Sequence, residues 1–149
     1  MDQERRNFSA FRKRDILKLQ VLQNKVSRLL SGLPPGTPTS DLLRATGELS
    51  VQQLTAYLGL VTAQKAMFYG KPKYLADRLQ ISDSEYLTRN SHRIKLQSNL
   101  TIARGSYFYR TAALYNLLPP QIRCSRMEPP KFKFRIKNWV QENIRVKPN

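Results

Sequence analysis

The sequence has one cysteine and one histidine, and this scarcity excludes two common ways of stabilising a small protein. A single cysteine, Cys124, cannot form a disulfide within the chain. Structural zinc sites use about four Cys or His ligands, so Cys124 and His92 cannot supply one between them. The sequence therefore predicts a fold held by its apolar core, without a metal ion.

Glycines and paired acidic residues are also scarce. The six glycines do not occur in the spacing of a phosphate-binding loop or a dinucleotide fingerprint, so no cofactor is predicted. Two-metal phosphoryl transfer needs converging carboxylates, yet the sequence contains no Asp-Asp pair. Acidic residues fall on separate predicted elements: Asp15, Asp41, Asp77, Asp83 and Glu85. We therefore predict no catalytic residues and a protein that is not an enzyme.

Long apolar runs are absent as well. No segment approaches the roughly 18–20 apolar residues that a membrane-spanning helix requires. Residues 1–6 are mostly charged and no apolar segment follows them, which is unlike a secretory signal. We therefore expect an intracellular protein with no membrane partner, in a nucleus or cytoplasm that the sequence does not distinguish.

What the sequence does have is positive charge, concentrated towards its end. The chain carries 26 basic and 10 acidic residues, for a net charge of +16. Residues 1–88 contribute +5 and residues 89–149 contribute +11, because only Glu128 and Glu142 are acidic in the second part. Such an excess indicates an anionic partner. Nucleic acid is the commonest partner of this kind, and an anionic membrane surface or an acidic protein are the alternatives.

A long amphipathic helix is predicted from Phe8 to Leu33. Its apolar positions are three or four residues apart once the place of Asp15 is counted, as one helical stripe requires. Gly32 and the Pro-Pro-Gly run at 34–36 end it. Asp15 interrupts the stripe, which favours a bundle helix over a coiled coil. The stripe comprises Phe8, Phe11, Leu19, Leu22, Val26, Leu29 and Leu33.

Three further helices are predicted before residue 80. Thr37 is the expected N-cap of a two-turn helix that ends at Gly47. Residues 50–53 form a capping box that opens a helix ending at Gly70, and a short amphipathic helix follows at residues 74–79. In the middle helix the residues expected to face inward are Val51, Leu54, Leu58, Val61 and Phe68.

The periodic pattern weakens after residue 82 and returns at Tyr107. Residues 82–105 indicate a basic connector, or one short strand at residues 94–96 or 100–103. Residues 107–118 predict a helix that Pro119 ends, with Phe108, Ala112, Tyr115 and one of the following leucines on its inner face.

The last element, residues 131–144, fits two patterns. As a strand, it would place Phe132, Phe134 and Ile136 on one face. As a helix, it would bury Phe132, Ile136, Trp139 and Val140. The helical set is longer, and Pro129 and Pro130 suit the start of a helix, so the sequence favours the helix.

Together these elements predict an all-α or mainly α fold, a small helical bundle with a long N-terminal helix. We expect a helical subdomain at residues 1–80, a basic connector at 81–105 and a basic C-terminal helical unit at 106–149. The connector would let the C-terminal unit fold back on the first helix.

Several blocks, in order, resemble a known family. Residues 19–28 (LQVLQNKVSR) are followed by a segment at 41–51, by residues 71–79 (KPKYLADRL) and by residues 107–123 (YFYRTAALYNLLPPQIR). Lys131–Phe132–Lys133 and Trp139–Val140 complete the series. This arrangement is similar to the region that follows the polymerase core in non-LTR, LINE-type retrotransposon reverse transcriptases. Tyr115 stands where that family usually has Trp.

The resemblance implies the C-terminal region of such an enzyme without its catalytic core. The Tyr-x-Asp-Asp turn of the family's polymerase is missing, and one histidine with scattered acids does not meet the needs of its endonuclease. The resemblance therefore implies a non-catalytic fragment that holds nucleic acid, either RNA or DNA. A truncated element remnant without an independent function is a further alternative.

The basic residues of the second half are the candidate nucleic-acid-binding residues. Cations neutralise phosphates and release counterions, and aromatic rings between them can stack on unpaired bases. We expect binding without sequence specificity. A second hypothesis is a helix-packing role, in which the stripe from Phe8 to Leu33 meets the polymerase core or a second copy. The candidate contacts are Arg89, Arg93, Lys95, Arg104, Arg110, Arg123, Arg126, Lys131, Lys133, Arg135 and Lys137.

Overall fold

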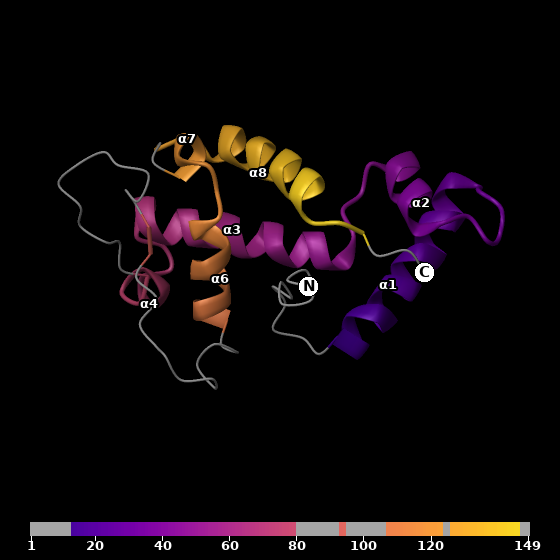
Figure 1. Cartoon of the computed structure of the whole chain (residues 1–149), viewed down its shortest axis with the longest axis horizontal. Coiled ribbons are helices and arrows are strands. Elements are labelled where there is room, and N and C mark those ends of the chain that lie inside the picture. The colour runs from indigo at the N-terminus through magenta and orange to yellow at the C-terminus, as the bar shows by residue number, and fades with distance from the viewer. Residues whose placement is uncertain (1–12, 80–92, 95–106, 124–125, 147–149) are drawn as a thin grey trace.

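The computed structural model describes residues 13–79, 93–94, 107–123 and 126–146 of the chain. The described residues form helices connected by turns and loops, which confirms the predicted mainly helical fold (Figure 1). No described helix has both the length and the apolar composition needed to cross a membrane. The helices are α1 Lys13–Ser31, α2 Thr39–Thr46, α3 Val51–Tyr69, α4 Lys73–Ala76, α6 Tyr107–Asn116, α7 Pro120–Arg123 and α8 Pro129–Asn143.

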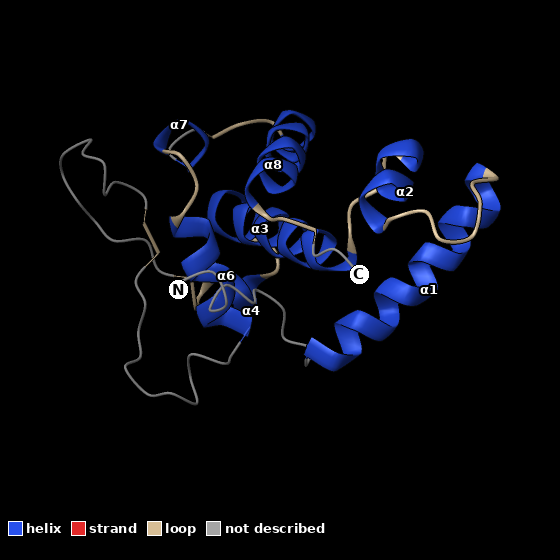
Figure 2. Cartoon of the chain, turned by 45° about the vertical axis from the view of Figure 1, so that its right-hand side comes forward, coloured by secondary structure: helices blue, strands red, loops and turns tan. Residues whose placement is uncertain are grey.

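Helix α3 is the central element. Helices α6 and α8 pack along it, α4 lies at its C-terminal end, and α1 with α2 lies towards its N-terminal end (Figures 1 and 2). Its buried face includes the small residues Ala56, Gly59, Ala63 and Ala66. At Gly59 an added Cβ would lie 3.6 Å from the Oγ1 of Thr111 on α6. Small side chains therefore let two helices approach α3 closely.

The ends of α3 follow the predicted capping pattern. The Ser50 hydroxyl accepts a hydrogen bond from the Gln53 backbone N–H, and the Gln53 side chain accepts one from the Ser50 N–H. This is the reciprocal capping box that the sequence indicated. Gly70 ends the helix with a φ of 64°, a left-handed conformation that glycine adopts at little cost. The prediction for both ends is confirmed.

The inner face of α3 was predicted wrongly. Leu54 and Leu58 are 42% and 53% exposed, and of the five residues expected inside only Val61 is buried, while Val51 and Phe68 are half-buried. The buried face instead combines small residues with Leu60 and Gln64. The prediction followed the largest apolar side chains. In the structure, the helices that pack on α3 contact a face made largely of small side chains.

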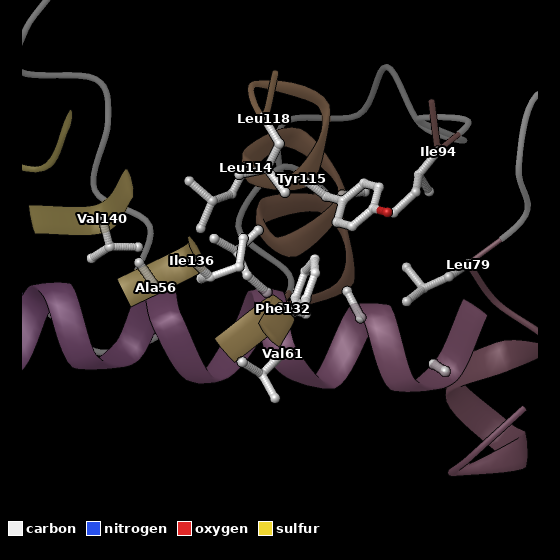
Figure 3. Close-up of a cluster of buried hydrophobic side chains, with 14 of the residues drawn as sticks. Ala56, Val61, Leu79, Ile94, Leu114, Tyr115, Leu118, Phe132, Ile136 and Val140 are labelled. Atoms are coloured by element: carbon white, nitrogen blue, oxygen red, sulfur yellow. The ribbon is translucent and has the colours of Figure 1, made fainter. Parts of the chain in front are cut away.

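A single hydrophobic core connects α3 to the C-terminal helices. Phe132, Ile136 and Val140 of α8 are fully buried; Phe132 lies between α3 and Tyr115 of α6, and Val140 lies beside Ala56 of α3 (Figure 3). The cluster extends along the chain from Ala56 to Ile144. The C-terminal helices therefore pack on α3, and α1 is not the main partner that the fold-back hypothesis assigned to them. The proposed connector at 81–105 lies outside the described residues except for Arg93 and Ile94.

Helix α8 confirms the helical interpretation of residues 131–144. Pro129 and Pro130 occupy its first turn, as predicted. Phe134, two residues after Phe132, lies about 200° around the helix from it and is exposed. Two side-chain hydrogen bonds from α3 flank α8: Gln64 donates to the Met127 carbonyl (3.2 Å) and Gln53 donates to the Ile144 carbonyl (2.7 Å).

Most of the residues predicted for the inner face of α6 are buried in the structure. Ala112, Tyr115 and Leu118 are buried, whereas Leu117 is 47% exposed.

The start of α2 differs from the prediction. Its N-cap is Pro38 instead of Thr37. The Thr37 hydroxyl donates a hydrogen bond to the Pro34 carbonyl within the preceding turn (2.8 Å).

Helix α1 packs on α2 through its polar face, which overturns the expectation that its apolar stripe faces the core. Asn24 Nδ2 donates to Thr39 Oγ1 (2.8 Å), and Ser27 Oγ donates to Glu48 Oε2 (2.7 Å). Leu22 and Leu29 of the stripe are 56% and 85% exposed. Hydrogen bonding of polar side chains to the α2 region decides this orientation. Phe8 and Phe11 lie outside the described residues.

The two phenylalanines of α8 provide a test of the packing. Phe132→Ala is expected to lower the free energy of unfolding by about 3–5 kcal/mol, because it opens a cavity in the core. Phe134→Ala removes an exposed ring and should change it by less than about 0.5 kcal/mol. Urea unfolding of both variants measures the difference. Equal losses would contradict this helical register.

Candidate nucleic-acid interface

Four of the candidate basic residues lie together on α8. Lys131, Lys133, Arg135 and Lys137 are all exposed, and the segment 129–141 that contains them has no acidic residue. The buried positions Phe132, Ile136 and Val140 fix which side of the helix faces α3. The four cations therefore share the solvent-facing part of one helix. We call these four residues the α8 basic face.

The order of charges along α8 is opposite to the one that favours helix stability. Helix N-termini carry partial positive charge and favour acidic side chains, whereas C-termini favour basic ones. The first turn of α8 has no acidic residue and its last turn has no basic residue, while Lys131 stands in the first turn. Glu128 at the N-cap offsets part of this positive charge, and Pro129 and Pro130 have no N–H to donate, so the groups that an anion could meet here are the basic side chains.

Two contacts connect the α8 region to its neighbours. The Lys137 ammonium donates a hydrogen bond to the Gly47 carbonyl (3.3 Å), at the C-terminal cap of α2. Arg126, three residues before α8 begins, is exposed and its guanidinium carbon lies 5.6 Å from the centre of the Tyr69 ring. Arg126 therefore adds a fifth exposed cation close to the start of α8.

Arg123 occupies a different environment from the one expected of a phosphate contact. It is 1% exposed, and its Nη1 donates to the carbonyls of Asn116 (3.0 Å) and Leu118 (3.2 Å). The Tyr115 hydroxyl donates in turn to the Arg123 carbonyl (3.0 Å). Arg123 thus satisfies backbone carbonyls at the C-terminal end of α6. Its guanidinium is inside the protein, so we leave it out of the interface.

The remaining candidates are two described residues on other elements and three residues outside the described part of the chain. Arg110 is half-buried on α6, and its Nη1 has no hydrogen-bond partner among the described residues. Arg93 is exposed beside Ile94, whose backbone N–H and C=O both bond to the Asn116 side chain (2.8 and 3.0 Å). Arg89, Lys95 and Arg104 lie outside the described residues.

Phe134 is a further residue of this surface, one that the candidate set did not include. Its ring is 67% exposed in the middle of the α8 basic face. A sequence signal for it existed, because a helix that buries Phe132 and Ile136 must turn the residue between them outward. Trp139, by contrast, packs partly buried against the core.

The chemistry of this surface is that of charge and stacking. No group of three or more His, Cys, Asp or Glu side chains that could hold a metal ion occurs in the described part of the chain. Ammonium and guanidinium groups around the exposed part of α8 can neutralise phosphates, and the exposed ring offers a flat apolar contact.

Comparison with known proteins gives no relative. No protein-family model matches the sequence, and neither a characterised protein nor a solved structure matches it.

The buried position of Arg123 generates a prediction. Arg123→Gln would leave the Asn116 and Leu118 carbonyls without their donor and should lower the free energy of unfolding by about 1–3 kcal/mol. Arg126→Gln removes the same charge from an exposed site and should change stability by less than about 0.5 kcal/mol. Thermal unfolding of the pair compares them. A stable Arg123→Gln variant would argue against the internal role.

Proposed function

We propose that the chain binds nucleic acid without sequence specificity and without catalysis, as the C-terminal region of a LINE-type retrotransposon reverse transcriptase. The observation that carries the proposal is the α8 basic face, with four exposed cations distributed around the solvent-facing part of the helix and no acid between residues 129 and 141. RNA and DNA present the same phosphate charge, so the proposal covers both.

The mechanism is electrostatic. Each cation that meets a phosphate releases condensed counterions, which favours binding through entropy and makes it fall with salt. Contacts to phosphate carry no sequence information, which accounts for the absence of sequence specificity in the proposal.

Attachment of α8 to α3 supports this role. Phe132, Ile136 and Val140 of α8 are fully buried in the core. Hydrogen bonds from Gln64 and Gln53 of α3 reach the residues just before and just after α8. The cations therefore project from a fixed scaffold, and less conformational entropy is lost when they bind than on a mobile segment.

The family resemblance adds independent support through the structural roles of its residues. Gln20 and Asn24 of the first block make hydrogen bonds on the polar face of α1. Tyr115, Asn116 and Arg123 of the closing block make the bonds that hold α6, α7 and Ile94 together. Residues of two of the blocks thus make hydrogen bonds between separate segments of the fold.

Charge removal on α8 tests the proposal. A variant with Gln at Lys131, Lys133, Arg135 and Lys137 is expected to bind a labelled oligonucleotide at least about tenfold more weakly at low salt. The slope of log affinity against log salt should become shallower by about 0.7 for each single-strand phosphate that the variant no longer neutralises. Fluorescence anisotropy at several salt concentrations measures both quantities.

The matched control removes the same charge from α1. Lys13, Arg14, Lys18 and Lys25 are four exposed cations on that helix, and their replacement by Gln lowers the net charge equally. We expect a clearly smaller loss of affinity in this variant. Equal losses would indicate diffuse attraction by net charge without an α8 interface. A native chain that binds no oligonucleotide at low salt would end the proposal.

A second candidate function, self-association, is favoured by the exposed stripe of α1. Leu19, Leu22, Val26 and Leu29 have alternating spacings of three and four residues, the pattern of a coiled-coil seam. The polar face is already occupied by α2, so the stripe is free to meet the same stripe of a second copy. Such a pairing would bury leucines that now face water.

Sedimentation at several protein concentrations tests this candidate. We expect a weak, concentration-dependent dimer that Leu22→Asp abolishes, because a carboxylate would be buried in the seam without a partner. Leu17→Asp is the control, since Leu17 is similarly exposed (54%) but lies about 140° around the helix from Leu22. A monomer at all concentrations would exclude self-association and leave the nucleic-acid proposal unaffected.

A further inference from the structure

Phe134 contributes nothing visible to the core. Its ring is 67% exposed, whereas α8 packs on α3 through Phe132, Ile136 and Val140. Lys, Gln and Glu have higher helix propensity than Phe at an exposed position. Neither packing nor helix formation therefore explains an aromatic residue here.

Four of the residues that surround Phe134 on α8 are cationic. Lys131 and Lys137 lie one turn before and after it on the same face of the helix. Lys133 and Arg135 flank it on either side. About 9 Å of helix axis separates Lys131 from Lys137, so phosphates on both sides of one nucleotide could each meet a cation.

We infer that Phe134 stacks on an unpaired nucleobase, and that the α8 basic face therefore prefers single-stranded nucleic acid to duplex. Bases in a duplex already stack on their neighbours and turn only their edges to the grooves. An unpaired base exposes its flat face, and aromatic side chains within a positive surface bind such faces with little dependence on sequence. This inference rests on the proposed function and specifies its substrate.

The test compares the native chain with Phe134→Ala on three probes. These are a single-stranded DNA of about 12 nucleotides, an abasic strand with the same phosphates, and a duplex of the same length. Anisotropy titrations at one low salt concentration give the affinities. Asn138→Ala, an exposed residue one turn further along the same face, is the control variant.

Phe134→Ala is expected to weaken binding of the base-bearing single strand about fivefold or more, and to leave binding of the abasic strand and the duplex unchanged. Asn138→Ala should change none of the three. Phe134→Trp should bind the base-bearing single strand as tightly as the native chain does, unlike Phe134→Ala. Its added tryptophan should be quenched by the base-bearing strand and not by the abasic one, beyond the quenching that Trp139 shows in the native chain.

The possible failures are distinguishable. Binding of the native chain to all probes with no effect of Phe134→Ala would overturn the stacking inference and leave the proposed function standing. An equal loss on the base-bearing and abasic strands would also overturn it, because the ring would then act without bases. Failure of the native chain to bind any probe would remove the proposed function itself.

Discussion

The structure depends on the close contact between the small-residue face of α3 and the helices α6 and α8. Ala56, Gly59 and Ala63 leave room for side chains from the other helices, and Phe132 and Ile136 occupy the core without exposure. Because this contact fixes which side of α8 faces inward, it also fixes which residues of α8 face the solvent. The positive surface is a consequence of the core.

Burial separates Arg123, which has a role inside the fold, from the exposed basic residues of α8. Arg123 is buried, where the two carbonyls that its Nη1 meets offset the cost of removing its charge from water. The cations of α8 remain exposed, where their charge is available to a polyanion. A cluster of like charges near the start of a helix works against helix stability, which favours a binding role for it.

Helix α1 reverses the usual arrangement of an amphipathic helix. Its buried residues are Asn24, Ser27 and a single apolar residue, Ile16, and its leucines face solvent. Specific polar bonds thus hold α1 in place while its apolar side remains exposed. Burying that side would lower the free energy of the apolar surface, so α1 offers the molecule a second contact surface, separate from the α8 basic face.

The sequence by itself determined the elements and the sign of the surface. Capping residues at Ser50 and Gly70 marked the ends of α3, and the periodicity around Phe132 indicated a helix with Phe134 outside. Local hydrogen bonding and helical spacing contain this information. Only the tertiary structure decided which faces α3 and α1 bury, whereas the buried faces of α6 and α8 followed from the sequence pattern. For α3 that choice followed the packing of small residues, and for α1 it followed side-chain hydrogen bonds between distant segments. The burial of Arg123 followed two carbonyls, one at the last residue of α6 and one just after it.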